Sequence, residues 1–231
     1  KKDDYLRLSL AAEEIFLYLG EYVCPDKSLE VQCENGLYYT RVAFYFSASQ
    51  LNLSGLNIAS VAVHEGDADL EAMGLLIASR SVDHLHVTVE KNNRIVLSVT
   101  KEKSYPAYEE KLPAPGPAEK LVTETPDTEK LKVFAAMTAQ YYAPIRRPSF
   151  FSRPGKLVDM VHSGQYGAII ALNEKRDIAG GILLCFRTEK IVQIFGPYCF
   201  LKEQQRAVDE ALLDACIHRI ARTKALGLFS L

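Results

Sequence analysis

The sequence of 231 residues contains no tryptophan and no apolar run approaching the roughly 18 residues that a membrane-spanning helix requires. Charge of either sign is not in large excess, because 27 Lys and Arg face 29 Asp and Glu; this excludes a broad basic surface for nucleic acid. The five cysteines form no Cys-x-x-Cys pair, which argues against a disulfide scaffold or a zinc site. We therefore expect a cytoplasmic protein with no membrane or nucleic-acid partner and no bound metal.

Hydrophobic residues make up 48% of the chain, which is enough for a substantial core. Proline is concentrated in the segment 102–120, where four proline rings and a glycine exclude a helix or a central strand and flanking charges favour exposure to water. The sequence predicts a Pro-rich linker there. The linker separates a first domain of residues 1–101 from a second domain of residues 121–231, each of ordinary domain size.

Hydrophobic periodicity in the first domain predicts two helices and four strands, with a long loop over 47–66. Polar Asn92 and Asn93 suit the tight turn of the last hairpin. The order α-β-β-α-β-β indicates a helix layer on a mostly antiparallel sheet, an α+β fold. The predicted helices cover 4–19 and 69–82, and the predicted strands cover 29–33, 37–46, 84–90 and 94–100.

The second domain shows the order β-α-α-β-β-β-α-β. Its last hairpin is expected to end at Phe195, with Gly196 and Pro197 forming a bend that terminates the strand. The predicted strands are 120–124, 166–173, 180–187, 191–195 and 226–231, and the predicted helices are 127–142, 156–163 and 204–224.

The first domain resembles the ATP-binding domain of anti-sigma-factor serine kinases, within the histidine-kinase-type ATPase superfamily. The resemblance rests on the helix Leu8–Leu19, the glycine-box-like Ala72–Ile77 followed by Val82 and Asp83, and the closing hairpin. It implies an α/β sandwich in which Glu14 stands at the place of the catalytic carboxylate and Gly74 in the nucleotide-binding glycine box.

Several family residues are replaced. Tyr18 stands where the magnesium-binding Asn belongs, Ala72 replaces a glycine that lets phosphate approach, and residues 41–47 lack the Asp-x-Gly motif that reads adenine. The resemblance therefore implies a degenerate domain that keeps the fold but does not hold ATP and Mg²⁺. As a plain alternative, Glu14 belongs to the solvated face of a helix.

The segment Gly164–Phe200 resembles the central strands of GNAT-type N-acetyltransferases, and the order of elements around it agrees. The resemblance implies a mixed sheet with helices on both faces and acetyl-CoA as cofactor. Backbone amides near Gly196, Tyr198 and Cys199 are then expected to bind the acyl carbonyl. The next helix start is expected to take the pyrophosphate through the matching positions Gln205 and Arg206.

Here too the match is incomplete. Val208 and Glu210 occupy positions where the family has small residues, and the charges of Asp209 and Glu210 repel phosphate at the helix start. The sequence stops at Leu231, where the family has its fifth strand, so we expect a GNAT-like domain without its final elements. Catalytic residues are not assigned.

Three further patterns carry alternatives. His84 and His86 share a strand face without a third metal ligand, which favours a solvated polar face. Cys199 fits a buried thiol better than a nucleophile, for which His218 is the only nearby partner along the chain. The aromatic and Arg-rich segment 141–153 fits either an acceptor or protein contact, or a loop with its rings in the core.

Two functions follow. The first is a bacterial signalling or regulatory protein, in which an acyl-CoA-dependent N-acetyltransferase module acting on a small amine is fused to an ATPase-like module without turnover. Fusion of these two domain types is the pattern of such bacterial proteins. The alternative is a non-catalytic interaction protein that binds a protein partner and in which neither pocket works.

Overall fold

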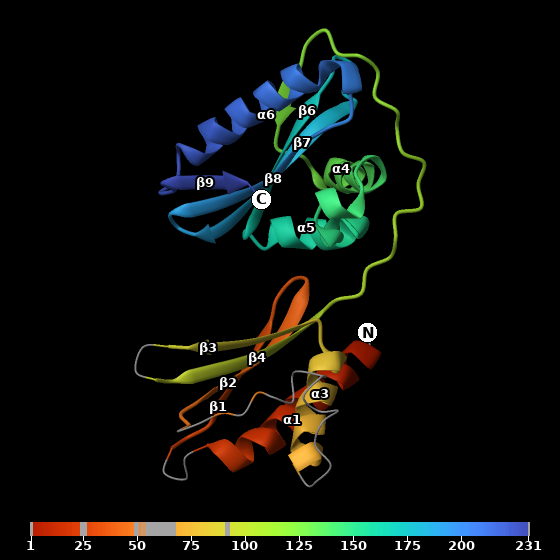
Figure 1. Ribbon diagram of the computed structural model, residues 1–231. Helices are drawn as coiled ribbons and strands as arrows, with labels where there is room; N and C mark the ends of the chain where they lie inside the picture. The colour runs from red at the N-terminus through yellow and green to blue at the C-terminus, as the bar shows by residue number, and fades with distance from the viewer. Residues whose placement is uncertain are drawn as a thin grey trace. The chain divides into compact units, whose positions relative to one another are not determined.

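The computed structural model describes residues 2–23, 27–48, 51, 53, 68–90 and 93–230. Tertiary contacts divide the chain into two compact units, Lys1–Ser104 and Tyr105–Leu231 (Figure 1). Each unit has its own sheet and its own hydrophobic core. The two are therefore described separately.

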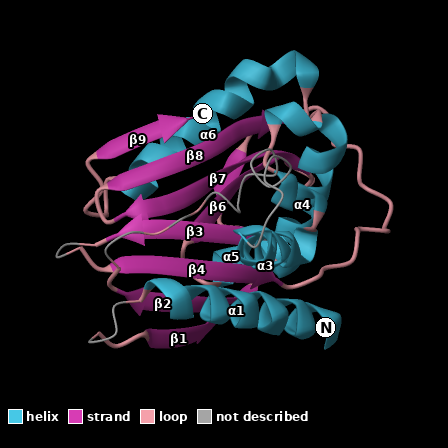
Figure 2. Cartoon of the chain, turned by 60° about the horizontal axis from the view of Figure 1, so that its bottom comes forward, coloured by secondary structure: helices cyan, strands magenta, loops and turns pink. Residues whose placement is uncertain are grey.

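The first unit is a four-stranded antiparallel sheet with two helices on one face (Figure 2). The strand order is β1-β2-β4-β3, which confirms the predicted helix layer on an antiparallel sheet. The predicted loop over 47–66 lies mostly outside the described residues. The elements are α1 (Lys2–Tyr22), β1 (Glu30–Asn35), β2 (Tyr39–Phe46), α3 (Ala68–Ser81), β3 (His84–Val89) and β4 (Ile95–Glu102).

Strand alternation explains how this unit buries its core. Val42, Phe44 and Phe46 of β2 point toward α1 and α3, where Ile15 and Leu75 meet them. The intervening residues of β2 face the other side of the sheet, which carries polar and aromatic side chains. The described helices α1 and α3 therefore cover the same face, as an amphipathic pattern on both elements requires.

The second unit is a five-stranded mixed sheet in the order β5-β6-β7-β8-β9, where only the pair β8 and β9 is parallel. Helices α4 and α5 cover one face and α6 the other, which confirms the predicted mixed sheet (Figures 1 and 2). The elements are β5 (Val122–Glu124), α4 (Thr128–Tyr141), α5 (Pro154–His162), β6 (Tyr166–Leu172), β7 (Ile178–Thr188), β8 (Ile191–Cys199), α6 (Gln205–Ile220) and β9 (Gly227–Ser230), with short 3-10 turns at Pro144–Arg146, Ser149–Ser152 and Lys202–Gln204.

Helix α4 begins as the sequence predicts, because the Asp127 side chain accepts a hydrogen bond from the Lys130 amide at 2.8 Å and so caps it. Of the aromatic segment 141–153, Phe151 is fully buried and Phe150 packs against the same core. These two rings of the segment therefore lie in or against the core, while Tyr141 is exposed.

The proline-rich segment is mostly exposed but contacts the second unit at several points. The Tyr105 hydroxyl donates a hydrogen bond to Asp159 of α5. Ala118 is buried, and its backbone N–H and C=O bond the Gln204 side chain at 2.8 and 2.6 Å. Residues 103–120 form no helix or strand, as predicted, and from Tyr105 onward the segment groups by its contacts with the second unit.

The core of the second unit depends on a glycine in β7. An added Cβ at Gly181 would lie 2.4 Å from a ring carbon of Phe134, whose side chain is fully buried. We predict that Gly181→Ala lowers the free energy of unfolding by about 1–3 kcal/mol, because the packed ring cannot move aside. The measurement is urea denaturation of the full chain.

Gly227→Ala is the matched control, since nothing lies within 4 Å of a Cβ at that strand position. We expect it to change the free energy of unfolding by less than about 0.5 kcal/mol. Equal effects of the two substitutions would contradict the packing argument.

Candidate functional site

Strand β8 continues past the point where the sequence predicts its end. The bend expected at Gly196 and Pro197 is instead a β-bulge, after which β8 resumes its pairing with β7 and runs to Cys199. Gly196 has a φ of +98°, and a Cβ there would lie 2.8 Å from the Tyr198 nitrogen. Because other residues rarely adopt this conformation, the bulge requires glycine.

The extra residue shifts the alternation of side chains along β8. Phe195 before the bulge and Tyr198 after it both face α4 and α5, while Cys199 faces α6. Tyr198 is buried, and burial, assisted by the neighbouring Tyr142, raises the pKa of Tyr198 to about 12. Of the residues predicted to contact acyl-CoA, Tyr198 therefore lies in the core, on the opposite face of the sheet from Cys199.

Strand β8 ends beside the start of α6. Its parallel pairing with β9 joins Ile191–Ile194 to Gly227–Ser230, and β8 continues beyond it through the bulge to Cys199. A short 3-10 turn, Lys202–Gln204, then leads into α6. The end of β8 and the first turn of α6, where the sequence resemblance implies acyl-CoA contacts, are therefore neighbours along the chain.

Tyr142, from the aromatic segment 141–153, contacts the end of β8. The Cys199 amide donates a hydrogen bond to the Tyr142 hydroxyl at 2.8 Å, and that hydroxyl donates to the Cys199 carbonyl at 3.0 Å. The Tyr142 ring also packs edge-on against Tyr198, with centroids 4.9 Å apart. Its place just after the last turn of α4 was visible in the sequence, but a pairing 57 residues away was not.

The Cys199 thiol is held by its own chain. Its sulfur donates to the Leu201 carbonyl at 3.2 Å and accepts from the Leu201 amide at 3.3 Å. Burial raises the pKa of Cys199, and the nearby Asp209 charge adds to that rise. The thiol is therefore protonated at neutral pH, which favours the structural role over the nucleophilic one.

The start of α6 carries two competing carboxylates. The Arg206 guanidinium donates to Glu210 at 2.8 Å, and the Gln205 side chain interacts with Asp209. The Oδ1 atom of Asp209 is nonetheless buried, and none of the described residues donates a hydrogen bond to it. Both predicted pyrophosphate contacts are thus directed toward carboxylates of the same helix.

Burial raises the pKa of Asp209, and the Gln205 contact only partly opposes that rise. The same carboxylate raises the pKa of both Tyr142 and Cys199 through its charge, which places it close to the bulge in β8. The end of β8 therefore adjoins a tyrosine hydroxyl, a thiol and a carboxylate with one unbonded oxygen.

In the first unit the structure brings together the two residues predicted to contact nucleotide. A Cβ at Gly74 of α3 would lie 2.7 Å from Oε2 of Glu14 on α1. Because Gly74 has no side chain, the Glu14 carboxylate can lie close to the α3 backbone at this position. The negative charge stands where the resemblance implies a phosphate.

The remaining polar patterns have local partners. His84 Nε2 lies 3.1 Å from Glu102, and its ring stacks on His86 with centroids 6.1 Å apart. Within the ranges that the structure describes, no three His, Cys, Asp or Glu side chains gather to hold a metal ion. No helix in those same ranges is both long and apolar enough to cross a membrane.

No family model matches the chain, and no curated protein sequence matches it. Seven chains of solved structures do. An acetyltransferase of Trypanosoma brucei is 11% identical with a TM-score of 0.37, and the match covers 48% of this chain and 82% of that one. A ribosomal-protein-alanine N-acetyltransferase of Brucella melitensis is 12% identical with a TM-score of 0.38, and the match covers 48% of this chain and 79% of that one.

An aminoglycoside acetyltransferase from an uncultured soil sample is 16% identical with a TM-score of 0.39, covering 48% of this chain and 79% of that one. Likenesses at this level assign no activity to the chain. Each of these three acetyltransferases covers about half of it, and the ATPase-like resemblance of residues 4–101 has no counterpart among them.

The unsatisfied carboxylate yields a stability prediction. Because the pKa of Asp209 is raised in the folded state, the folded protein holds this proton more readily than the unfolded chain, and stability falls as pH rises from about 4 through the raised pKa. We expect Asp209→Asn to be more stable than the wild type by about 1 kcal/mol at pH 7. The advantage should disappear below about pH 4, in urea denaturation measured across that range.

Asp214→Asn, which neutralises an exposed carboxyl on the same helix, is the control. An Asp209→Asn advantage that persisted unchanged at the lowest pH would contradict the assignment of the effect to this carboxylate.

Proposed function

We propose that the second unit binds an acyl-CoA between the end of β8 and the first turn of α6 and serves as an N-acetyltransferase module for a small amine. The observation that carries the proposal is the β-bulge at Gly196, after which β8 ends at Cys199 shortly before the N-terminal turn of α6. A helix start offers unbonded amides and a positive dipole end to phosphate groups.

The chain's own residues supply specific parts of such a site. The backbone amide of Cys199 can bind an acyl carbonyl once its hydrogen bond to Tyr142 breaks. The Arg206 guanidinium can bind phosphate once its ion pair with Glu210 breaks. Asp209 is placed to accept the proton of an amine, since burial already favours its protonated form. Acyl-CoA brings a thioester whose carbonyl the amine attacks.

The fit to a diphosphate is incomplete, and this favours a second candidate. Asp209 and Glu210 put negative charge into the first two turns of α6, and Tyr142 already uses the Cys199 amide. A non-catalytic module that binds a protein partner explains these same contacts.

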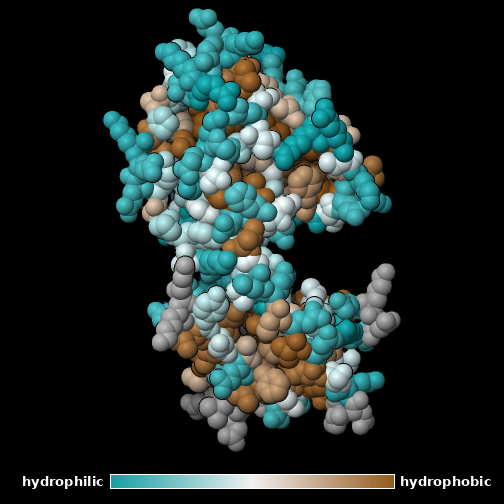
Figure 3. Space-filling view, turned by 180° about the vertical axis from the view of Figure 1, so that it is seen from behind, coloured by the Kyte–Doolittle hydropathy of each residue, from teal (hydrophilic) through white to brown (hydrophobic). Residues whose placement is uncertain are grey.

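For the first unit we propose an interaction or regulatory role, in line with a bacterial signalling protein, without ATP turnover. Glu14 fills the space beside Gly74 with a carboxylate. Apolar side chains are also exposed over part of the unit's surface, as the lower part of Figure 3 shows. They include Leu6, Leu10 and Leu17 of α1, which share one stripe of the helix.

Ligand-induced stabilisation tests the acyl-CoA proposal. Acetyl-CoA at 100 times its Kd should add about 2.7 kcal/mol to the stability of the unit that binds it. Glu210→Gln should tighten binding roughly two- to fivefold because it removes a negative charge and frees Arg206, and Arg206→Ala should weaken it by a similar factor. The measurement is thermal melting with acetyl-CoA titrated to millimolar concentration.

Glu129→Gln is the matched control for charge, since Glu129 pairs with Lys132 on the surface of α4 at 2.7 Å. A wild-type melting temperature that does not move at millimolar acetyl-CoA would discard the acyl-CoA proposal and leave the interaction module.

Tyr142→Phe separates the acyl contact from the phosphate contact. The substitution removes the hydroxyl that occupies the Cys199 amide and costs about 1 kcal/mol of stability. We expect it to tighten acetyl-CoA more than CoA, because only acetyl-CoA carries the carbonyl that the released amide binds. The same change for both ligands, measured by calorimetric titration, would place the acyl group elsewhere.

A further inference from the structure

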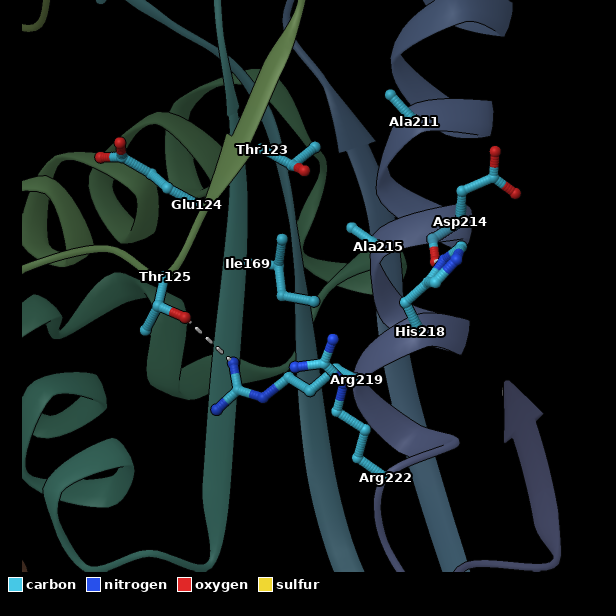
Figure 4. Close-up of a pocket in the computed structure, with 10 residues that line it drawn as sticks. All are labelled: Thr123, Glu124, Thr125, Ile169, Ala211, Asp214, Ala215, His218, Arg219 and Arg222. Atoms are coloured by element: carbon cyan, nitrogen blue, oxygen red, sulfur yellow. Dashed lines mark hydrogen bonds between the residues drawn. The ribbon is translucent and has the colours of Figure 1, made fainter.

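The second unit contains a hollow of about 820 Å³ between α6 and the edge strand β5. On the helix side it is lined by Ala211 and Ala215, one turn apart, whose side chains end at Cβ and leave space above Ile169 of β6 (Figure 4). Small-molecule sites have volumes of about 300–1,000 Å³. The hollow reaches the last turn of α6, about 20 Å along the helix from the candidate acyl-CoA site.

Arg219 is fixed over the sheet at one end of this hollow. Its guanidinium donates to the Ala168 carbonyl at 3.0 Å and lies 3.5 Å from the Thr125 hydroxyl, and it packs against Gly167, where a Cβ would come within 3.1 Å of it. All of these partners are neutral. The positive charge of Arg219 is therefore positioned but not compensated.

Arg222 adds a second positive charge from the next turn. Figure 4 shows its side chain turned back toward Arg219, and it is exposed. No carboxylate of the described residues lies within ion-pair distance of either arginine. Arginine stays charged at any working pH, so the two guanidinium groups place two positive charges at this end of the hollow.

The two acidic side chains around the hollow do not cancel this charge. Glu124 bonds Lys130 and Arg176 at 2.6 Å each, and these contacts hold the pKa of Glu124 below its usual range. Asp214 lies a full turn nearer the helix start than His218 (Figure 4). The arginine end of the hollow is therefore positive.

We propose that this hollow binds a small organic oxyanion, a phosphate ester or a carboxylate, between Arg219 and Arg222. The apolar body of the ligand rests on Ile169, Ala211 and Ala215, and Asp214 favours ligands with a hydrogen-bond donor at the far end. An oxyanion bound there accepts hydrogen bonds from both guanidinium groups and compensates their charge, which arginine geometry suits.

Calorimetric titration at low salt tests the site with three probes: phenyl phosphate, benzoate and inorganic phosphate. We expect saturable binding of phenyl phosphate or benzoate with a Kd on the order of 1 mM or tighter. The tighter of the two identifies the oxyanion class. Inorganic phosphate should bind more weakly than phenyl phosphate, because it has no apolar body to bury.

Three variants locate the binding. Arg219→Gln and Arg222→Gln should each weaken the better probe by roughly tenfold, since each removes a charge-assisted contact. Arg222 is exposed, so its substitution tests binding without risk to the core. Ala211→Leu keeps both charges and fills the hollow, and it should weaken phenyl phosphate while leaving inorganic phosphate unchanged.

Lys224→Gln is the control, because it removes one positive charge of an exposed side chain that pairs with Glu189 at 3.3 Å. The proposal fails if neither organic probe binds saturably, if Lys224→Gln weakens binding as much as Arg222→Gln, or if Ala211→Leu has no effect on phenyl phosphate. Acetyl-CoA is also titrated into the Arg222→Gln variant. An acetyl-CoA affinity equal to that of the wild type shows that the two proposed sites are independent, so that the failure of one proposal does not decide the other.

Discussion

The β-bulge at Gly196 is the constraint on which the second unit depends. One extra residue in β8 reverses the side-chain alternation after it, so that Tyr198 joins the core beneath α4 and Cys199 turns toward α6. A regular strand would exchange the two and place a tyrosine against α6. The same bulge lies just before the end of β8, and it brings the Cys199 amide within reach of Tyr142. The position of the candidate acyl site and its occupation by Tyr142 therefore have one cause.

Helix α6 distributes its charges as a helix dipole favours, and this bears on both proposed sites. Asp209 and Glu210 lie near its N-terminus, and Arg219 and Arg222 near its C-terminus. This arrangement stabilises the helix by itself but opposes an anion at the N-terminus, where the dipole would otherwise attract one. At the C-terminus the positive charge of the two arginines exceeds the partial negative charge of the helix dipole, and neither arginine has a carboxylate partner among the described residues. The charges therefore favour an oxyanion at the last turn over one at the first.

Local sequence signals predicted most of the fold, because they act over a few residues. The apolar strand 166–173, the helix predicted over 127–142 and the hairpin at Asn93 each depend on neighbours in the chain, and each element formed as expected. The site was harder to predict, because its contacts join distant segments: Tyr142 with Cys199, and Ala118 with Gln204. The bend expected at Gly196 shows the same limit. Gly-Pro suits the end of a strand as well as a bulge, and only pairing with β7 beyond it decides between the two.

Glycine was the least reliable guide to function, for a physical reason. A missing side chain permits close approach, but it does not specify what approaches. At Gly74 the neighbour is the Glu14 carboxylate, at Gly181 the Phe134 ring and at Gly167 the Arg219 guanidinium. In each case the chain's own side chain occupies the space beside the glycine. The hollow beside Arg219 is a better place to search for a ligand than the space beside Gly74, because there the charged side chain lines a hollow of about 820 Å³.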